Sequence, residues 1–177
     1  WDINGDCEIS QSEAAKVTSL NNVFKGSSII MFNELKYFTG LTELEEHAFK
    51  NCSNLKYIVL PKQLTTINSY AFEGCSSLEN IDIPESVISI GYAAFKDCSS
   101  LKNINIPNSV ITIGQFAFYS CKKLTSIVIG DNVTTIGENA FSCCYNLTIK
   151  CYAGTAAYDY ALENSINTYL LGYQIAY

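Results

Sequence analysis

Five cysteines recur at a fixed spacing of 23 residues, a pattern that could provide disulfides, metal ligands or nucleophiles. They are among the eight cysteines of the chain and comprise Cys52, Cys75, Cys98, Cys121 and Cys144. If the period reflects stacked coils, equivalent side chains lie in one straight column, about 4.8 Å apart. Parallel thiols in such a column lack the dihedral angle of a disulfide and cannot converge tetrahedrally on zinc. We therefore predict a column of reduced, buried cysteines that act as small polarizable filler.

Other candidates for chemistry are few. The period breaks near Cys143, Cys144 and Cys151, so a Cys143–Cys151 disulfide is an alternative there. His47 is the only histidine, and it shares its repeat position with ordinary side chains in the other repeats: Tyr70, Ala93, Phe116 and Asn139. A Cys-His or Ser-His nucleophile pair would need His47, and the sequence contains no glycine-rich phosphate loop. The sequence therefore predicts a protein that is not an enzyme.

The segment "DINGDCEISQSE" (2–13) has the spacing of oxygen ligands for Ca²⁺. Aligned with an EF-hand loop, the ligands are Asp2, Asn4, Asp6, the carbonyl of Glu8, Ser10 and the bidentate Glu13. The segment also resembles the loops of dockerin-like modules in bacterial exported proteins. One position departs from the pattern, because Cys7 replaces the usual glycine at a cost of about 1–2 kcal/mol. The alternative is an acidic turn that caps a helix over residues 11–20, with Ser10 as the N-cap and Glu13 completing a capping box.

The cysteines belong to a longer repeated phrase. Phenylalanine recurs three residues before each cysteine, and leucine three residues after it: Phe49, Phe72, Phe95, Phe118 and Phe141, with Leu55, Leu78, Leu101, Leu124 and Leu147. An alanine precedes each phenylalanine, and two isoleucine-rich positions follow each of the first four leucines. Many columns in one register predict a solenoid, and the period lies within the range of leucine-rich repeats.

The elements of one coil follow from the residue pattern. Ile104 and Ile106 alternate with asparagines, which predicts a short strand with one inward face. Pro107 ends this strand, and "VITIG" (110–114) predicts a second strand ended by glycine. The phrase A-F-x-x-C-x-x-L predicts one or two tight helical turns that return the chain. A single coil cannot bury these side chains, whereas stacked coils bury them as continuous columns.

Repeats such as "LKNINIPNSVITIGQFAFYSC" (101–121) closely resemble the BspA-type leucine-rich repeat family of bacterial and protist surface proteins. The resemblance covers roughly residues 41–147. It implies a right-handed solenoid with a parallel β-sheet on one face, and short second strands and tight turns on the other. For function, it implies adhesion or ligand binding outside the cell, with the protein secreted or attached to the cell surface.

We expect four segments. Residues 1–24 form the calcium-type loop and a short helix, residues 25–40 an N-terminal cap or degenerate repeat, and residues 41–147 the solenoid. Residues 148–177 form an α/β cap, whose helix begins near Gly154 and Thr155, runs to about Asn164 and precedes a final strand.

Composition excludes several classes of partner. The 177-residue chain has 11 basic and 17 acidic residues and a net charge of −6, which argues against binding nucleic-acid phosphates or anionic lipid. No uninterrupted apolar run approaches the ~18 residues of a transmembrane helix. Because the chain begins at Trp1, we expect a processed or trimmed form, with an exported precursor as one source.

The outward positions of the first strands are the candidate binding residues, because they differ between repeats. They are Lys56, Tyr57, Glu79, Asn80, Asp82, Lys102, Asn103, Asn105 and Ser126. Most are charged or amide side chains, and no aromatic platform for sugars stands out among them. We therefore expect a monomeric module that binds a protein of the host matrix or cell surface rather than a glycan. The alternatives are a solvated scaffold face, and a spacer or assembly module presented through the dockerin-like loop.

Overall fold

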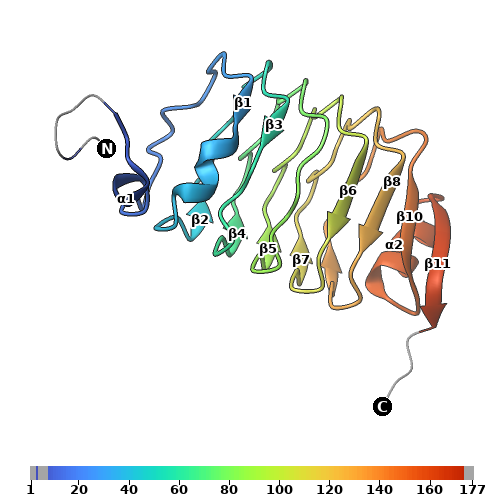
Figure 1. The fold of residues 1–177 in the computed structure, drawn as a ribbon. Coiled ribbons are helices and arrows are strands. Elements are labelled where there is room, and N and C mark those ends of the chain that lie inside the picture. Colours follow the sequence, from blue (N-terminus) through green and yellow to red (C-terminus); the bar gives the residue numbers. More distant parts are fainter. Residues whose placement is uncertain (1–2, 4–7, 174–177) are drawn as a thin grey trace.

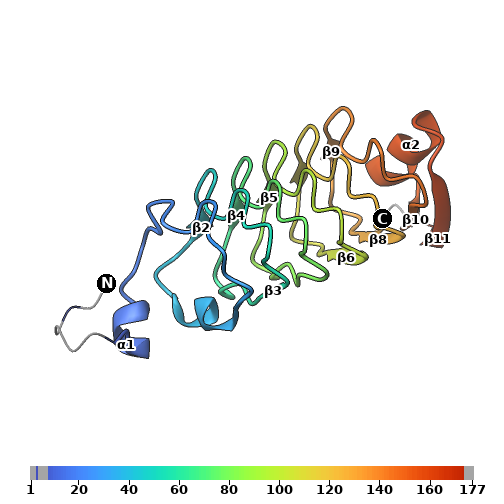
Figure 2. The same cartoon turned by 90° about the horizontal axis from the view of Figure 1, so that it is seen from above.

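The chain winds into a solenoid of stacked coils, in which short strands of successive coils lie side by side (Figure 1). This architecture comes from a computed structural model, which describes residue 3 and residues 8–173. Viewed from above, the short strands lie on two sides of the solenoid, and the turns between them lie in register along it (Figure 2). The predicted repeat solenoid with parallel sheets is therefore confirmed.

The elements are short, as expected for coils of 23 residues. In chain order they are α1 (Gln11–Ala14), β1 (Met31–Phe32), the 3₁₀ helix η1 (Asn33–Tyr37), β2 (Glu43–Leu44), β3 (Tyr57–Ile58), β4 (Thr66–Ile67), β5 (Ser89–Ile90), β6 (Asn103–Ile106), β7 (Thr112–Ile113), β8 (Ser126–Ile129), β9 (Thr135–Ile136), β10 (Thr148–Ala153), α2 (Ala156–Glu163) and β11 (Asn167–Tyr173). The predicted C-terminal helix corresponds to α2, with Thr155 as its N-cap.

The strands pair in parallel in three sheets. The second strands of the coils form one sheet in the order β2-β4-β5-β7-β9, and the first strands form the pair β1-β3 and the sheet β11-β10-β8-β6. Pairing in the first of these sheets follows the sequence period, since Ile67 faces Ile90 and Ile90 faces Ile113. Between β3 and β6, Ile81 and Ile83 are buried as expected, although the described backbone there is not assigned as a strand.

The returning turns differ from the predicted helical turns. Amide N–H groups alternate between a bond three residues back and a bond to the next coil. Lys50 N–H donates to the His47 carbonyl at 3.0 Å, whereas Phe49 N–H donates to the Ala71 carbonyl at 2.7 Å. Because half of the donors serve the neighbouring coil, the turns also form a ladder along the solenoid.

This alternation requires a left-handed backbone at two positions in every turn. The first position has φ between 50° and 67° and holds His47, Tyr70, Ala93, Phe116 and Asn139. The second has φ between 59° and 74° and holds Asn51, Gly74, Asp97, Ser120 and Cys143. The tight turns expected on this face are therefore present, but they alternate with left-handed residues, because right-handed residues alone cannot make these bonds to the next coil.

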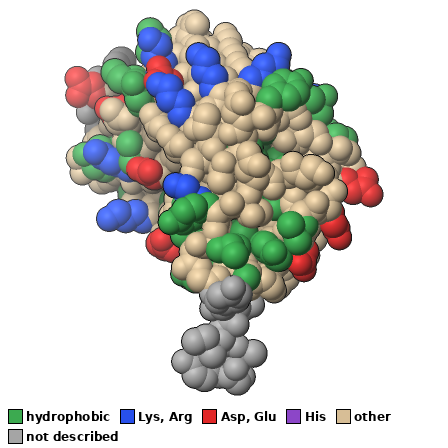
Figure 3. Space-filling view, turned by 90° about the vertical axis from the view of Figure 1, so that its right-hand side faces the viewer, with side chains coloured by type: hydrophobic (Ala, Val, Ile, Leu, Met, Phe, Trp, Pro, Cys, Tyr) green, Lys and Arg blue, Asp and Glu red, His purple; other side chains and the backbone are tan. Residues whose placement is uncertain are grey.

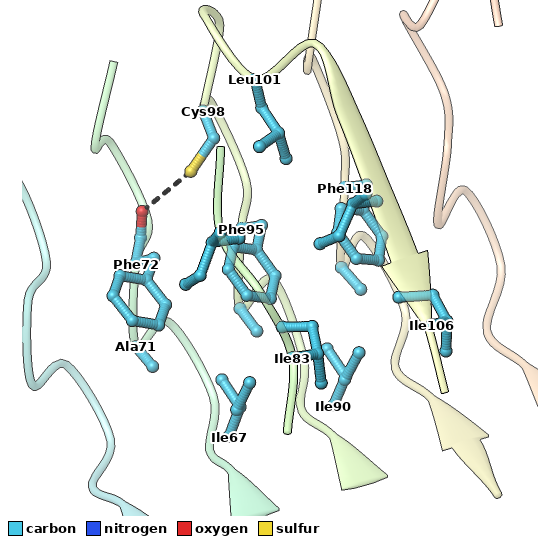
Figure 4. Packing of buried hydrophobic residues seen from close by; sticks show 14 of the residues in the cluster. Ile67, Ala71, Phe72, Ile83, Ile90, Phe95, Cys98, Leu101, Ile106 and Phe118 are labelled. Carbon is cyan, nitrogen blue, oxygen red and sulfur yellow. Dashed lines mark hydrogen bonds between the residues drawn. The ribbon is translucent and has the colours of Figure 1, made fainter. Parts of the chain in front are cut away.

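The core consists of ladders of identical side chains (Figure 4). The repeated phenylalanines stack with ring centroids 5.1–5.4 Å apart and interplanar angles of 3–9°. Phe24 extends this ladder beyond the first regular repeat by stacking on Phe49 at 5.4 Å. At the other end, the ring of Tyr160 from α2 meets Phe141 edge-on at 5.7 Å and closes the ladder.

The cysteine column is buried, and its thiols are hydrogen-bond donors. Each Sγ lies 2.8–3.2 Å from a phenylalanine carbonyl oxygen of the preceding coil; the donors are Cys52, Cys75, Cys98, Cys121 and Cys144. The cysteines of residues 8–173 are all free, including Cys143 and Cys151, so the alternative disulfide is not formed in this structure. The thiols thus fill space as expected and also bind backbone carbonyls, a role that the sequence analysis did not include.

The C-terminal end of the solenoid is formed by α2 and β11 (Figure 1). Seen along the solenoid from this side, charged side chains occupy the margins, and hydrophobic side chains gather on the lower part of the end (Figure 3). Exposed residues here include Tyr169, Leu170 and Leu171 of β11. Within the described ranges, no helix is long and apolar enough to span a membrane.

Candidate binding surfaces

Part of the predicted binding surface forms a groove near the N-terminal end of the sheet face. The groove has a volume of about 280 Å³, and its exposed lining comprises Met31, Asn33, Tyr57, Val59, Asn80 and Asp82. Met31 is 58% exposed and Tyr57 is 43% exposed. Strand pairing between β1 and β3 brings the two together, because Met31 faces Tyr57 in the register. The structure thus unites three predicted residues with an apolar residue from outside the regular repeats.

An ion pair crosses the sheet face beside this groove. Lys102 Nζ lies 2.6 Å from Glu79 Oε2. The hydrogen bond from Lys102 lowers the pKa of Glu79, and the nearby charge of Lys56 lowers it further. The same hydrogen bond raises the pKa of Lys102. The lysines and the glutamate that alternate in sequence therefore interact electrostatically across neighbouring coils.

The remaining predicted residues lie farther along the same face. Asn103 and Asn105 project outward from β6, and Ser126 of β8 pairs with Asn103 in the strand register. Asn105 lines a second hollow together with Val128, Tyr152 and Leu171, of about 260 Å³. The nine predicted residues thus form an elongated surface with a hollow toward each end.

The N-terminal loop is described only in part. Asp2, Asn4 and Asp6 lie outside the described residues, whereas Glu8, Ser10 and Glu13 lie within them. Glu13 is buried, and its Oε2 accepts hydrogen bonds from the Ser10 amide at 2.9 Å and the Ser10 hydroxyl at 2.7 Å. Glu13 Oε1 accepts a hydrogen bond from the Ile3 amide at 2.9 Å. Ser10 and Glu13 together form the capping box of α1. Within residue 3 and residues 8–173, no group of three or more His, Cys, Asp or Glu side chains could hold a metal ion.

A larger hollow lies on the returning turns and was missed in the sequence. Its volume is about 640 Å³, and five aromatic side chains line it: His47, Tyr70, Tyr92, Phe116 and Tyr119. His47 stacks on Tyr70 with centroids 5.0 Å apart and an interplanar angle of 14°. Tyr92 meets Tyr70 at 66° and Phe116 at 78°, with centroid distances of 5.2 and 5.7 Å. We call this surface the turn-face hollow.

A charged network crosses the turn-face hollow. Glu73 Oε2 forms an ion pair with Lys50 Nζ at 2.5 Å, and its Oε1 accepts a hydrogen bond from Lys96 Nζ at 3.2 Å; the Glu73 side chain is only 14% exposed. Although burial alone would raise the pKa of Glu73, these two lysines hold it below its usual value. Glu73 in turn raises the pKa of Lys96, and Lys50 Nζ lies 4.8 Å from the centre of the Tyr70 ring. The network fixes both lysines beside the aromatic row.

The aromatic row was missed because its members come from different repeat positions. His47, Tyr70 and Phe116 share one position, but the same position in the intervening coil is Ala93. Tyr92, the neighbouring residue in sequence, provides the ring in that coil. Comparing two adjacent columns together, rather than each column alone, would have revealed an aromatic residue in four successive coils.

Comparison with protein families finds one matching model. The model of the BspA type leucine-rich repeat region matches residues 17–151 in six copies. Among curated proteins, none matches the chain significantly.

Solved structures of leucine-rich repeat proteins resemble this one. A leucine-rich repeat protein from Bacteroides ovatus is 35% identical, with a TM-score of 0.66, over 72% of this chain and 33% of its own. A leucine-rich repeat protein of T. pallidum is 35% identical, with a TM-score of 0.61, over 62% of this chain and 52% of its own. A leucine-rich cell surface protein from Faecalibacterium prausnitzii is 33% identical, with a TM-score of 0.62, over 72% of this chain and 33% of its own. The chain thus spans about a third to a half of the length of these proteins.

Proposed function

Because the chain belongs to the BspA-type leucine-rich repeat family, we propose that it is a non-enzymatic module that binds a protein partner outside the cell through its sheet face. The similar protein from Faecalibacterium prausnitzii is a cell surface protein, which supports secretion or surface attachment here. The groove between β1 and β3 carries the proposal, because it combines an exposed tyrosine and methionine with polar side chains.

The composition of the groove suits a protein partner. Tyr57 offers a large amphipathic side chain of the kind that dominates binding energy in interfaces, and Met31 can adapt its shape to an apolar partner residue. Asp82 adds a negative charge at the edge, and the net charge of the chain is −6. We therefore propose a partner surface with an apolar side chain beside a basic one, such as that of a host matrix or cell-surface protein, bound by a monomer of this module.

Immobilised host matrix and cell-surface proteins would test this function, with binding of the purified module measured by biolayer interferometry. We expect Tyr57→Ala to weaken binding at least about tenfold, since tyrosine hot spots contribute 2 kcal/mol or more. Replacing Asn80, Asp82, Asn103 and Asn105 together should weaken it further. Tyr145→Ala is the matched control, because Tyr145 is 76% exposed and lies outside the groove.

Two results would count against this function. If the module retains none of the proteins, the spacer or assembly alternative presented through the N-terminal loop is favoured. If it binds a protein but the sheet-face replacements leave affinity unchanged, the proposed surface is wrong.

We also propose that the loop at residues 2–13 binds Ca²⁺ through Asp2, Asn4, Asp6, Glu8, Ser10 and Glu13. The spacing of these oxygen ligands carries the proposal. Glu13 draws the loop together, because its two oxygens accept the amides of Ile3 and Ser10. Carboxylate, amide and carbonyl oxygens are the ligands that Ca²⁺ prefers, and the residue set fits the ion.

A further inference from the structure

The turn-face hollow is separate from the sheet-face groove, and their lining residues do not overlap. Its volume of about 640 Å³ lies in the range of small-ligand sites. We propose that this hollow binds a neutral oligosaccharide, with Tyr92 as the platform against which a sugar ring packs.

The orientation of Tyr92 is the first argument. His47 and Tyr70 stack at 5.0 Å, close to the spacing of neighbouring coils, so their ring planes lie across the solenoid axis. Tyr92 is turned by 66° from Tyr70 and by 78° from Phe116, so its ring plane runs along the row instead. Tyr92 is 39% exposed, whereas Ala93 beside it is fully buried. A ring in this orientation can offer a face to the C–H groups of a sugar.

The charge of the hollow is the second argument. Glu73 is paired with Lys50 and Lys96, so opposite charges face each other along the lining. A charged ligand would have to break these pairs, whereas sugar hydroxyls can accept from a lysine and donate to a carboxylate at once. Because the network holds the lysines in place, little side-chain freedom is lost on binding.

The backbone is the third argument. His47, Tyr70 and Phe116 carry large side chains at left-handed positions with φ of 67°, 59° and 57°. Asn139 occupies the equivalent position in a later coil, so a residue better suited to this conformation is compatible with the repeat. Because the ladder to the next coil imposes this conformation whatever the side chain, the fold does not require an aromatic ring at these three positions.

Titration of the 177-residue chain with neutral oligosaccharides would test the site, using calorimetry and ligand-observed NMR. The probes are gluco-, xylo-, manno-, galacto- and chito-oligosaccharides, with a sulfated and a carboxylated oligosaccharide for comparison. We expect at least one neutral oligosaccharide to bind with a dissociation constant below about 1 mM. Its affinity should be nearly the same at low and high salt, because screening acts on interactions between charges.

Four variants make the test specific. Tyr92→Ala should weaken binding at least about tenfold, as removal of a stacking platform does. Tyr92→Phe should retain most of the affinity because the ring remains. Tyr145→Ala should change nothing, since Tyr145 is exposed outside the hollow. Lys96→Ala should also weaken binding, because it removes a hydrogen-bond donor. This variant tests the hollow even if Tyr92→Ala does not fold.

The proposal is overturned if no neutral oligosaccharide binds at concentrations up to about 10 mM, well above the expected dissociation constant. It is also overturned if only the anionic oligosaccharides bind, or if both Tyr92→Ala in a folded state and Lys96→Ala retain full affinity. The function proposed for the sheet face is tested independently, because Tyr57→Ala should weaken protein binding and leave oligosaccharide binding unchanged. Tyr92→Ala should have the opposite effects.

Discussion

The thiol of Cys98 donates a hydrogen bond to the carbonyl oxygen of Phe72, with 3.2 Å between sulfur and oxygen (Figure 4). The same carbonyl accepts the amide of Cys75 at 3.1 Å, so both of its acceptor positions are used. The equivalent thiol bond recurs in four other coils. Cysteine at this position therefore combines a small apolar volume with a donor that reaches the preceding coil.

Cys98→Ala should lower the free energy of unfolding by about 1–3 kcal/mol, because it removes buried sulfur and leaves a buried acceptor with one partner fewer. Urea denaturation followed by circular dichroism would measure the change. Ser100→Ala is the control, since Ser100 is only half-buried in the same coil. A loss for Cys98→Ala no larger than that of the control would show that the thiol bond contributes nothing.

The buried thiols should also be chemically inert in the native protein. Burial raises the pKa of the Cys98 thiol far above its usual value, and burial also contributes to the raised pKa values of Cys75 and Cys121. Because thiolate is the reactive form, these three should react with a thiol reagent only after unfolding, whereas the half-buried Cys143 should react in the native state. Mass spectrometry after labelling would map the sites. Native labelling of Cys98 would contradict the packing of the column.

The sequence period was sufficient to predict which side chains overlie one another. The spacing of Phe72 and Phe95 predicted a column, and their rings lie 5.1 Å apart. The alternation at Ile104 and Ile106 predicted an inward face, and both are buried. These features depend on local pattern and translation by one repeat, which a single sequence records directly.

The turn conformation and the turn-face hollow could not be predicted in the same way. Left-handed residues such as Tyr70 and Phe116 have no common side-chain signature, because the ladder to the next coil imposes the conformation. The position of Tyr92 between their rings depends on that conformation. The place of Met31 beside Tyr57 was also missed, since β1 lies where the repeat pattern is degenerate.

If the N-terminal loop binds Ca²⁺, adding about 1 mM Ca²⁺ should raise the melting temperature, because a ligand that binds only the folded state stabilises it. A chelator should reverse the shift, and Asp6→Ala should abolish it by removing a ligand. Mg²⁺ is the matched control ion, since its smaller size favours octahedral sites with several waters. A melting temperature indifferent to Ca²⁺ and chelator, with no heat of binding in calorimetry, would leave only the capping role of Ser10 and Glu13.

Glu73→Gln should lower the free energy of unfolding at neutral pH, and this difference from the original protein should disappear in acid. The lysines around Glu73 lower its pKa in the folded state, so its ionised form contributes stability above the unfolded carboxyl pKa of about 4.3. That contribution is lost as the pH falls through the lower folded pKa. We expect a loss of about 1–2 kcal/mol at pH 7, since hydrogen bonds to charged groups contribute this much and the lysines are partly exposed. Urea denaturation at several pH values would measure this loss.

Glu46→Gln is the control, because the Glu46 side chain is 60% exposed. It should change the free energy of unfolding by less than about 0.5 kcal/mol at every pH. A Glu73→Gln deficit that stays constant down to pH 3 would instead assign the effect to packing, because protonation would then have no influence on it.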